Sequence, residues 1–312
     1  MSEELQKKKL EKQGYRFVGK HSAVKICTYT KNAVIGKGTC YKEKFYGLKS
    51  HQCVQMTTSM TCPNRCQFCW RSLDSGTDIT MKSGIDDPKQ IIDSCFEEQR
   101  LLMSGFGGHP TMDKEKLEEA KNPKYFAISL TGEPTMYPKM NEFLKELRKR
   151  KCTSFLVTNG MFPEALEKLT DLPSQLYLSL DAPTKELYME VDNPVLKDYW
   201  ERMERTLKLF STLNTRKVIR ITAVKNLNMC EEDAYVKLIK EADPDFLEVK
   251  GYSWIGSSRE RLVESNVPTH QEARDFAQTL AEKLGWEISN EHKASRAILV
   301  TKKGFKITPL EF

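Results

Sequence analysis

The sequence predicts an α/β fold: an incomplete (β/α)6 barrel with a cysteine-bearing extension before it and a short strand pair after it. Two observations support this prediction. Short runs of β-branched and aromatic residues recur along the chain, and helical patterns lie between them. Strands that alternate with helices in this way run parallel and are joined by right-handed crossovers. Six such units fit an open barrel better than a closed barrel of eight strands.

The predicted strands are short and largely apolar, as strands covered on both faces are. They span residues 54–60, 125–130, 154–158, 175–180, 217–224 and 246–251. The helices predicted between the later strands cover residues 139–150, 163–170, 197–213 and 231–242. The terminal strand pair is expected at residues 286–289 and 297–302.

A further helix should begin at Asp87, whose side chain can cap it, because Pro88 suits the first turn of a helix. Apolar side chains then recur at helical spacing until Gly105, which can end the helix. These side chains are Ile91, Ile92, Cys95, Phe96 and Leu102. Residues 107–124 are rich in Gly, Pro, Lys and Glu and predict a loop with a short helix.

The N-terminal segment differs from this pattern. Residues 1–20 are polar and rich in lysine, which predicts a tail or a frayed helix. Residues 21–51 are predicted to be irregular, with several glycines as breakers. We therefore divide the chain into an extension, residues 1–53, and a barrel with a C-terminal extension, residues 54–312.

The positive charge of the chain is concentrated in its first part. The whole sequence carries 49 Lys and Arg against 43 Asp and Glu, a net charge of +6. Residues 1–50 hold twelve of the basic and four of the acidic residues, a balance of +8, which leaves −2 for the remainder. A basic segment on a nearly neutral body indicates a polyanionic partner such as RNA, although a solvated terminus would look similar.

The composition also indicates the environment of the protein. The apolar runs are too short to span a bilayer and no signal peptide opens the chain, so we expect a cytoplasmic protein without a membrane partner. Nine cysteines in a reducing compartment indicate metal binding rather than disulfides. We expect a monomer.

Three cysteines follow the first predicted barrel strand at C-x3-C-x2-C spacing: Cys62, Cys66 and Cys69. Thiolates bind iron–sulfur clusters, zinc or copper. Because zinc normally takes four ligands in a closed site, three thiols on a short loop favour a four-iron cluster with one iron open to a cofactor. A zinc loop and a redox-active trio are the alternatives. The loop lies at the carboxyl end of a strand, where α/β proteins place active sites.

A second trio stands earlier in the chain. Cys27, Cys40 and Cys53 are separated by twelve residues each time and lie on sequence without a core pattern. Cys95 and Cys152 instead belong to apolar patterns, so we expect both to be core residues. Cys230 is left unassigned.

Small polar residues follow several strands at the same rim. Gly132, between Thr131 and Glu133, can bring the backbone close to a ligand. Asn159, Ser179 and Asp181 follow or end the third and fourth strands. Each of these three side chains can bind a ligand or cap the next helix, and both alternatives remain open.

The loop of residues 254–262, after the sixth strand, contains Trp, Gly, Ser and Arg. Such a loop can stack on a nucleobase and hold a phosphate. The alternative is a surface loop with Trp254 in the core.

The cysteine loop, with Phe68 before its last cysteine and Thr131-Gly132-Glu133 one unit later, resembles the radical S-adenosylmethionine superfamily. In that superfamily the open iron binds the amino and carboxylate groups of S-adenosylmethionine, and the reduced cluster cleaves it to a 5′-deoxyadenosyl radical. The family usually has a glycine where this chain has Thr131. The resemblance implies a set of cofactor-binding residues, namely Phe68, Thr131, Gly132, Glu133, Asn159 and Ser179.

A finer resemblance, over about residues 20–305, is to the archaeal tRNA 4-demethylwyosine synthases. The upstream cysteine trio, the segment 131–138 (TGEPTMYP), and the loop 254–262 with Asn-Val-Pro at 266–268 carry it together. It implies a radical S-adenosylmethionine barrel with two 4Fe–4S clusters. It also implies a reaction that condenses the N1-methylguanosine just 3′ of the anticodon of tRNA-Phe with pyruvate into the tricyclic 4-demethylwyosine. The chain is too short to include the flavodoxin-like domain of eukaryotic relatives, so we expect an external electron donor.

In that family the second cluster and a lysine that forms a Schiff base handle pyruvate. The resemblance thus implies that Cys27, Cys40 and Cys53 bind the second cluster. Lys42 lies two residues after Cys40 and is our candidate for the catalytic lysine, with Lys44 as the alternative. A metal centre nearby would favour the free amine that imine formation needs. The ordinary fate of a lysine is the surface.

Two other functions remain open from the sequence. A radical S-adenosylmethionine enzyme with an auxiliary cluster could act on a peptide or protein, although such enzymes usually carry their extra cysteines after the barrel. A non-catalytic RNA-binding iron–sulfur or zinc protein is the alternative from another class.

Overall fold

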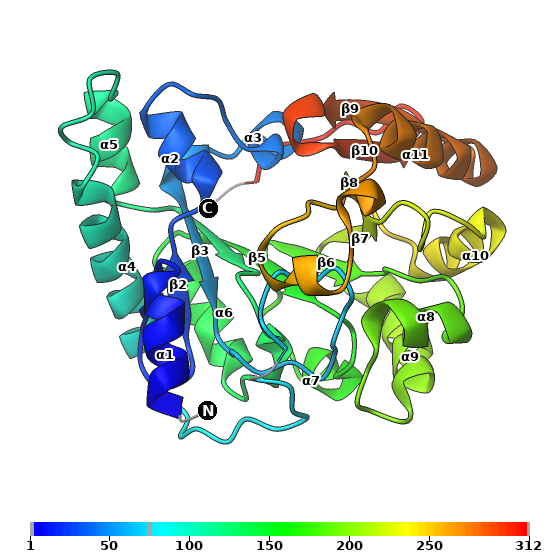
Figure 1. The fold of residues 1–312 in the computed structure, drawn as a ribbon, viewed down its shortest axis with the longest axis horizontal. Helices are drawn as coiled ribbons and strands as arrows, with labels where there is room; N and C mark the ends of the chain where they lie inside the picture. The colour runs from blue at the N-terminus through cyan, green and yellow to red at the C-terminus, as the bar shows by residue number, and fades with distance from the viewer. Residues whose placement is uncertain (1–2, 74–75, 311–312) are drawn as a thin grey trace.

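Six parallel strands form the centre of the fold, and their order in the sheet is their order in the chain. The computed structural model describes residues 3–73 and 76–310, and Figure 1 shows these strands side by side. They are β3 Cys53–Thr57, β4 Tyr125–Ile128, β5 Thr153–Thr158, β6 Gln175–Ser179, β7 Arg216–Ala223 and β8 Phe246–Gly251. All six predicted strands are confirmed, with ends shifted by a few residues, and neighbouring strands are parallel.

Antiparallel pairs extend both edges of the sheet. On one side β2 Ala23–Lys25 pairs with β3, and β1 Tyr15–Phe17 lies outside it. On the other side β10 Ala297–Lys302 pairs with β8, and β9 Trp286–His292 is outermost. The predicted C-terminal strand pair is therefore confirmed. The first two strands escape prediction from sequence because each has 3 residues, too few to display a period.

The N-terminal segment is more ordered than its composition predicts. Residues 1–20, predicted as a tail or frayed helix, contain the helix α1 Glu3–Lys12 and then β1, while residues 1–2 lie outside the described part. Residues 21–51 contain β2, α2 Thr28–Val34 and α3 Tyr41–Tyr46, so the prediction of irregular structure is wrong. Helices this short are unstable alone and form because their apolar side chains pack on the rest of the fold.

Helices cover the outer face of the sheet. The predicted ones are α4 Pro88–Ser104, α5 Lys114–Ala120, α6 Met140–Lys149, α7 Pro163–Glu167, α9 Tyr199–Thr212 and α10 Glu232–Ala242. The sequence did not indicate α8 Lys185–Asp192 or α11 His270–Leu284. Short 3-10 helices occupy Ser50–Gln52, Pro134–Met136, Gly256–Glu260, Glu264–Asn266 and Lys293–Ser295. The start of α4 is as predicted, since Asp87 accepts a hydrogen bond from the backbone N–H of Lys89 at 2.9 Å.

Successive side chains along each strand point to opposite faces of the sheet, so the core has an outer and an inner part. Phe126 and Ile128 of β4 point to the helices of the outer face, whereas Tyr125 points to the inner face. The apolar side chains of the inner face lie towards one end of the strands, where α3 covers them with Tyr41, Phe45 and Tyr46. The other end of the inner face is left for polar residues.

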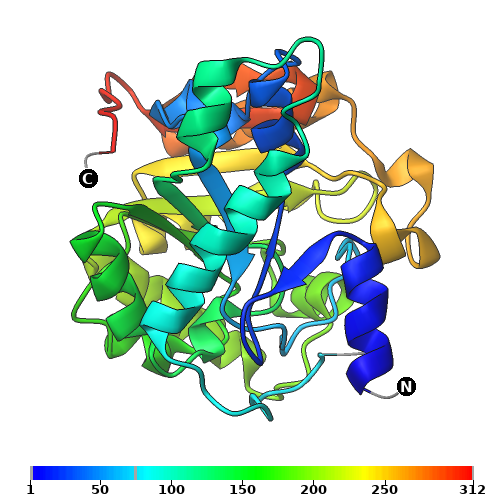
Figure 2. The ribbon, with the colours of Figure 1, turned by 90° about the vertical axis from the view of Figure 1, so that its left-hand side faces the viewer.

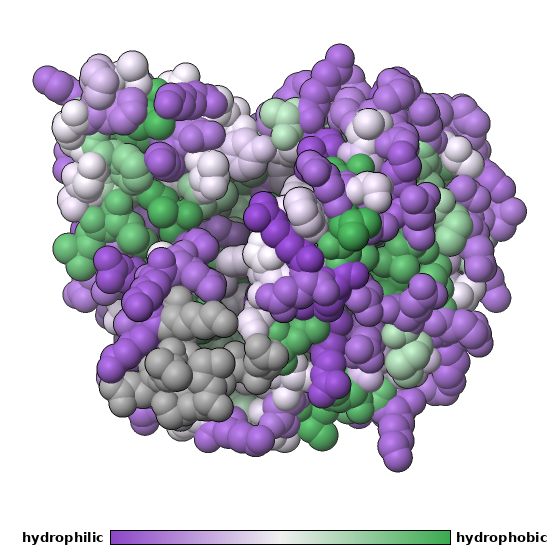
Figure 3. Space-filling model, in the orientation of Figure 1, coloured by the Kyte–Doolittle hydropathy of each residue, from purple (hydrophilic) through white to green (hydrophobic). Residues whose placement is uncertain are grey.

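The N-terminal extension therefore closes one end of the inner face and leaves the other end accessible. Figure 2 shows α4 crossing the edge of the sheet, with α1 to one side. Figure 3 shows the centre of the face seen in Figure 1 as a hollow. Within the described residues, no helix combines the length and apolarity that crossing a bilayer requires.

Candidate functional site

The loop of Cys62, Cys66 and Cys69 leaves β3 at its carboxyl end and is held by other segments of the chain. The Cys62 N–H donates to the carbonyl of Gly76 at 2.7 Å, and the Gln67 N–H donates to the carbonyl of Val191 at 2.8 Å. Val191 belongs to α8, a helix that the sequence did not indicate. The loop conformation thus depends on residues more than a hundred positions away.

The three thiols of this loop lie close enough to influence one another. Burial raises the pKa of Cys62 to about 11 and the pKa of Cys66 further, and the neighbouring thiols add to both shifts. The buried Arg71 lies beside them, and its charge lowers the pKa of Cys62. A trio of thiols beside an arginine suits a metal centre whose thiolates carry negative charge.

Gly132 brings the backbone after β4 against the start of the cysteine loop. Its φ is +71°, and a Cβ at this position would lie 1.9 Å from the carbonyl oxygen of Ser59. The carbonyl of Thr131 accepts a hydrogen bond from the Thr57 hydroxyl at 2.6 Å. Only glycine fits both the dihedral angle and the space, so Gly132 packs the turn after β4 directly against the backbone that leads into the cysteine loop.

Glu133 is fully engaged inside the protein. Its carboxylate accepts hydrogen bonds from the Thr135 and Thr158 hydroxyls at 2.6 and 2.8 Å and from the Asn159 N–H at 2.8 Å. Burial raises its pKa, and these donors oppose the rise. The carboxylate therefore ties the end of β4 to the end of β5, and its predicted contact with a cofactor stays a prediction.

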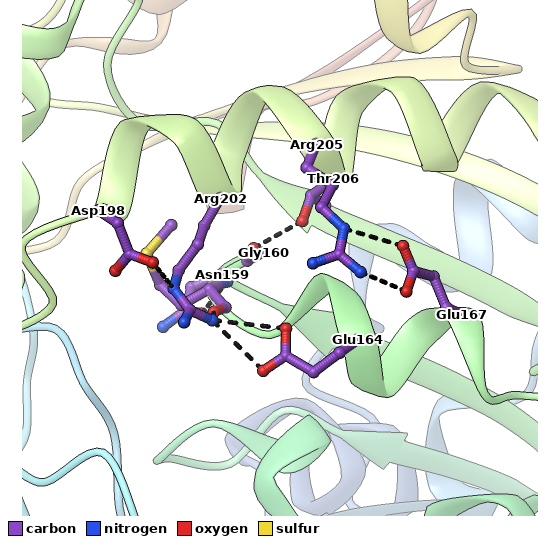
Figure 4. Close-up of polar contacts among 9 residues, drawn as sticks. Asn159, Gly160, Glu164, Glu167, Asp198, Arg202, Arg205 and Thr206 are labelled. Atoms are coloured by element: carbon purple, nitrogen blue, oxygen red, sulfur yellow. Dashed lines mark hydrogen bonds and ion pairs between the residues drawn. The ribbon is translucent and has the colours of Figure 1, made fainter.

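Asn159 reaches the first cysteine of the loop. Its Nδ2 lies 3.6 Å from the Cys62 Sγ, within hydrogen-bond range for sulfur. The turn that carries Asn159 is fixed by α9, because the Thr206 hydroxyl donates to the carbonyl of Gly160 at 2.6 Å. Figure 4 shows that α9 is itself attached to α7 by the pairs Arg202–Glu164 and Arg205–Glu167. Two helices thus position one amide at the thiol.

The remaining predicted side chains of the rim differ in their surroundings. Ser179 ends β6 on the inner face, half-buried and in register with Arg220 of β7. Asp181 is buried and accepts a hydrogen bond from the Thr222 N–H at 2.6 Å, while burial raises its pKa to about 6. Phe68 packs against the outer core.

The loop 254–262, predicted to contact substrate, lies against the cysteine loop. Arg261 donates from Nε to the carbonyl of Gln67 at 3.1 Å and from Nη2 to the carbonyl of Cys69. A Cβ on Gly256 would lie 2.2 Å from the carbonyl oxygen of Trp70. Bracing of the cysteine loop is a role of this segment that its composition alone does not suggest.

The second trio is assembled from three separate segments. Cys27 and Cys40 are the N-cap residues of α2 and α3, and Cys53 opens β3. The pKa of Cys40 is raised to about 11 and that of Cys53 higher still. Burial is the main cause of both shifts, and the neighbouring Cys27 thiol is the second. The structure therefore brings the three predicted cysteines together.

Lys42 joins this second trio, and Lys44 does not. The Lys42 side chain is 8% exposed, and its Nζ lies 5.1 and 4.5 Å from the ring centres of Phe155 and Tyr177 on the inner face. Its charge lowers the pKa of Cys40 and Cys53. Lys44 is exposed and donates to a backbone carbonyl, that of Glu291, at 2.6 Å. Of the two predicted candidates, Lys42 has the position of a site residue.

Three charged residues of the inner face were not predicted from the sequence. Glu248 is completely buried and accepts hydrogen bonds from three tyrosine hydroxyls, those of Tyr41, Tyr46 and Tyr177. Arg220 and Lys250 lie beside it on β7 and β8. A charged residue in the middle of an apolar strand is a usable signal for such a site, since unpaired charges are rarely buried.

The other cysteines lie apart from both trios. Cys95 and Cys152 are buried as predicted, and the thiol of Cys230 lies 3.8 Å from the carbonyl of Leu227. Within residues 3–73 and 76–310, no three His, Cys, Asp or Glu side chains converge tightly enough to hold a single metal ion. A four-iron cluster encloses iron and sulfide between its thiolates and so needs a wider trio.

Two protein-family models match the chain in succession. The model of the radical SAM superfamily matches residues 56–239, and the model of wyosine base formation matches residues 241–302. The S-adenosyl-L-methionine-dependent tRNA 4-demethylwyosine synthase of Pyrococcus abyssi is 44% identical, over 93% of this chain and 86% of that protein.

Solved structures give the same result over the whole chain. A structure of TYW1 with a lysine–pyruvate adduct bound has a TM-score of 0.88 and 32% identity, covering 99% of both chains. A crystal structure of archaeal TYW1 has a TM-score of 0.80 and 30% identity, again over 99% of both.

Proposed function

The chain belongs to the radical S-adenosylmethionine family of tRNA 4-demethylwyosine synthases, and from this premise we propose how its residues divide the work. As an enzyme of this family it modifies tRNA, with pyruvate as the second substrate. The proposed reaction joins pyruvate to the N1-methylguanosine next to the anticodon of tRNA-Phe and closes the third ring of the base. The observation that carries the proposal is the pair of cysteine trios at the two ends of β3, with Lys42 at the second.

Cys62, Cys66 and Cys69 would hold the cluster that binds S-adenosylmethionine. The fit rests on three mutually close thiols beside the buried Arg71. When bound, this cluster and S-adenosylmethionine supply the radical that removes hydrogen from the methyl group of the base. The protein keeps the site in shape: Asn159 contacts the Cys62 thiol and Arg261 holds the loop from the other side.

Cys27, Cys40 and Cys53 would hold the second four-iron cluster. Their thiols are close together and two of them stand at helix N-caps, where the partial positive charge favours thiolates. Lys42 would attack the keto carbon of pyruvate with its amine and release water, forming an imine. The aromatic rings of Phe155 and Tyr177 keep bulk water from that amine and give it a defined position.

The tRNA would approach the face on which the hollow opens. A pocket of about 560 Å³ lies there between α1 and the cysteine loop, with Lys7, Lys20 and Arg71 in its wall. Next to it Tyr15 stacks on Trp70 at 5.7 Å, with Lys25 over both rings. Cations beside aromatic rings suit a single-stranded nucleotide, and a base must leave its stack to reach a buried site.

Other expectations from the sequence stay predictions. They are the incomplete barrel, the boundary at residues 53 and 54, the external electron donor, the monomeric state and the cytoplasmic location. The strands β1 and β2 of the extension pair with β3, so any such boundary would run through one continuous sheet.

The direct test is anaerobic incubation of the reconstituted chain with N1-methylguanosine-containing tRNA-Phe, pyruvate and S-adenosylmethionine. We expect the digested tRNA to contain the tricyclic nucleoside, detected by mass spectrometry, only when all components are present. Carbon-labelled pyruvate should leave two of its three carbons in the nucleoside, one in the new ring and one as a methyl group on it, because the carboxyl carbon is lost. An unchanged guanosine with turnover of S-adenosylmethionine would contradict the proposed substrate.

A further inference from the structure

Arg220 stands on the inner face, and Glu248 and Asp181 are the acidic side chains that act on its charge. Its Nε is buried and has no hydrogen-bond partner among the described residues. The nearest acids are already occupied, since Glu248 accepts from three tyrosine hydroxyls and Asp181 accepts from the Thr222 N–H. A buried guanidinium left in this state has an unfilled capacity for an anion.

Lys250 supplies a second cation beside it. The register of β7 with β8 pairs Arg220 with Glu248 and Thr222 with Lys250, so Arg220 and Lys250 project from neighbouring strands on the same face. Burial, together with the charges of Arg220 and Arg296, lowers the pKa of Lys250 to about 8. Arg296 is itself held by the Tyr252 carbonyl and the Ser253 hydroxyl at 3.2 and 2.8 Å.

Arg220 and Lys250 lie near the segment that carries Cys40 of the second trio. Burial raises the pKa of Tyr41, the residue between Cys40 and Lys42, and the charge of Arg220 opposes this rise. The thiol of Cys40 in turn influences Lys250. Tyr177 connects the two sides, because its ring faces the Lys42 amine at 4.5 Å and its hydroxyl binds Glu248 at 3.2 Å.

We propose that Arg220 and Lys250 bind the carboxylate of the keto acid whose carbonyl reacts with Lys42. This inference rests on the proposed role of Lys42. The carboxylate of pyruvate is bonded directly to the carbon that forms the imine, so its binding site must adjoin the lysine amine. An arginine fork offers two parallel N–H donors that match a carboxylate, and a lysine beside it adds charge without a fixed direction. The pair would select 2-keto acids over neutral ketones and aldehydes and orient the imine before the radical step.

The test compares pyruvate with acetone, which forms the same kind of imine but has no carboxylate. The reconstituted chain is incubated with each compound and cyanoborohydride, and mass spectrometry measures labelling of the peptide that carries Lys42. We expect Arg220→Gln to raise the pyruvate concentration for half-labelling about 10- to 100-fold, because a charge-assisted pair is lost from a desolvated site. Lys250→Met should raise it several-fold, and Arg220→Lys should recover part of the loss.

Two controls make the result specific. Acetone should label Lys42 equally in the unchanged chain and in Arg220→Gln, which also shows that the variant is folded. Arg216→Gln is the matched variant on the same strand and face, because Arg216 donates from Nε to Gln175 and from Nη1 to the Thr308 carbonyl at 2.7 Å each, although its buried Nη2 has no partner among the described residues. In Arg216→Gln the pyruvate concentration for half-labelling of Lys42 should be unchanged.

Each contrary result is distinct. Pyruvate labelling that is indifferent to Arg220 and Lys250, or an equal loss with acetone, would overturn the carboxylate site while leaving Lys42 in its role. A loss of S-adenosylmethionine affinity in Arg220→Gln, without a change in pyruvate labelling, would assign the arginine to the methionyl carboxylate and overturn the inference. No adduct on Lys42 in the unchanged chain would overturn both this inference and the proposed role of the lysine.

Discussion

The two cysteine trios contain the same residues but are built in opposite ways. Cys62, Cys66 and Cys69 lie within one loop, and distant segments brace that loop from outside through Gln67, Asn159 and Arg261. The second trio comes from two helix N-caps and the start of a strand, and it has charged and aromatic side chains around it. The first trio is a local motif held by the fold, whereas the second exists only because the fold brings its parts together.

This difference corresponds to two kinds of chemistry. The rim around the first trio offers backbone and amide groups in fixed positions, which suit a cofactor of constant structure. The floor around the second offers an amine, a guanidinium and a second lysine, which suit a small reactive acid. Under the proposed function, the barrel rim would hold the radical chemistry, whereas Lys42 of the extension and Arg220 and Lys250 of the barrel would handle the keto acid.

Removal of one cysteine from each trio should separate these two roles most strongly. In Cys66→Ala, deoxyadenosine formation from S-adenosylmethionine should fall to background, because the cluster loses one of its three protein ligands. In Cys40→Ala, deoxyadenosine should still form while the tricyclic nucleoside disappears. Chromatography of both products in the same anaerobic reaction checks this. Equal loss of deoxyadenosine in the two variants would mean that the trios do not act separately.

Lys42→Ala should retain the iron content of both clusters and lose more than about 100-fold in nucleoside formation, because the imine cannot form. Iron and sulfide analysis, together with product mass analysis, measures both properties in one preparation. Lys44→Ala is the matched control from the same helix and should keep normal turnover, since its amine binds only a surface carbonyl. If Lys44→Ala lost product formation and Lys42→Ala did not, the exposed Lys44, and not the buried Lys42, would be the lysine that reacts with pyruvate.

Neutralising the rim pocket should weaken tRNA binding by a smaller amount. Lys7→Gln combined with Lys20→Gln should lower affinity about 10-fold near 0.15 M salt and flatten the salt dependence, because phosphate contacts release counterions. Neutralising Lys31, Lys37 and Lys49 should have a weaker effect, since Lys49 already pairs with Glu119 at 2.9 Å. Filter binding at several salt concentrations measures the affinity and its salt dependence for both combined variants. A larger loss of affinity in the variant of Lys31, Lys37 and Lys49 would place the RNA site at the other end of the extension.

Lys250→Met should stabilise the purified chain at pH 7 by ~1–3 kcal/mol, because it removes a desolvated cation that lies beside Arg220 and Arg296. The folded pKa of Lys250 is about 8, below that of an unfolded lysine. Below pH 8 the amine is protonated in both states and its cost is complete. As the pH rises from 8 towards the unfolded pKa, the folded state loses its proton first and the cost disappears. Thermal unfolding at pH 7 and pH 10 should therefore show a difference between the chains that shrinks with pH; a constant difference would contradict this account.

The sequence alone determined those features that depend on short-range pattern. The six parallel strands and the helices between them follow from periodicity, and the first trio follows from spacing within one loop. Gly132 follows from a turn that needs its dihedral freedom. Each of these depends on residues a few positions apart, so the chain displays them without its fold.

Only the tertiary structure decided which side chains meet on the inner face. β1, β2, α2 and α3 are too short to show a period and form because they are packed on the sheet. Lys42 and Lys44 are nearly indistinguishable in sequence, and burial over Phe155 and Tyr177 separates them. Arg220 and Lys250 come together because strand register places two cations on neighbouring strands of the same face. Such contacts join residues far apart in the chain, and their distances are set by the alignment of whole strands, which no local pattern encodes.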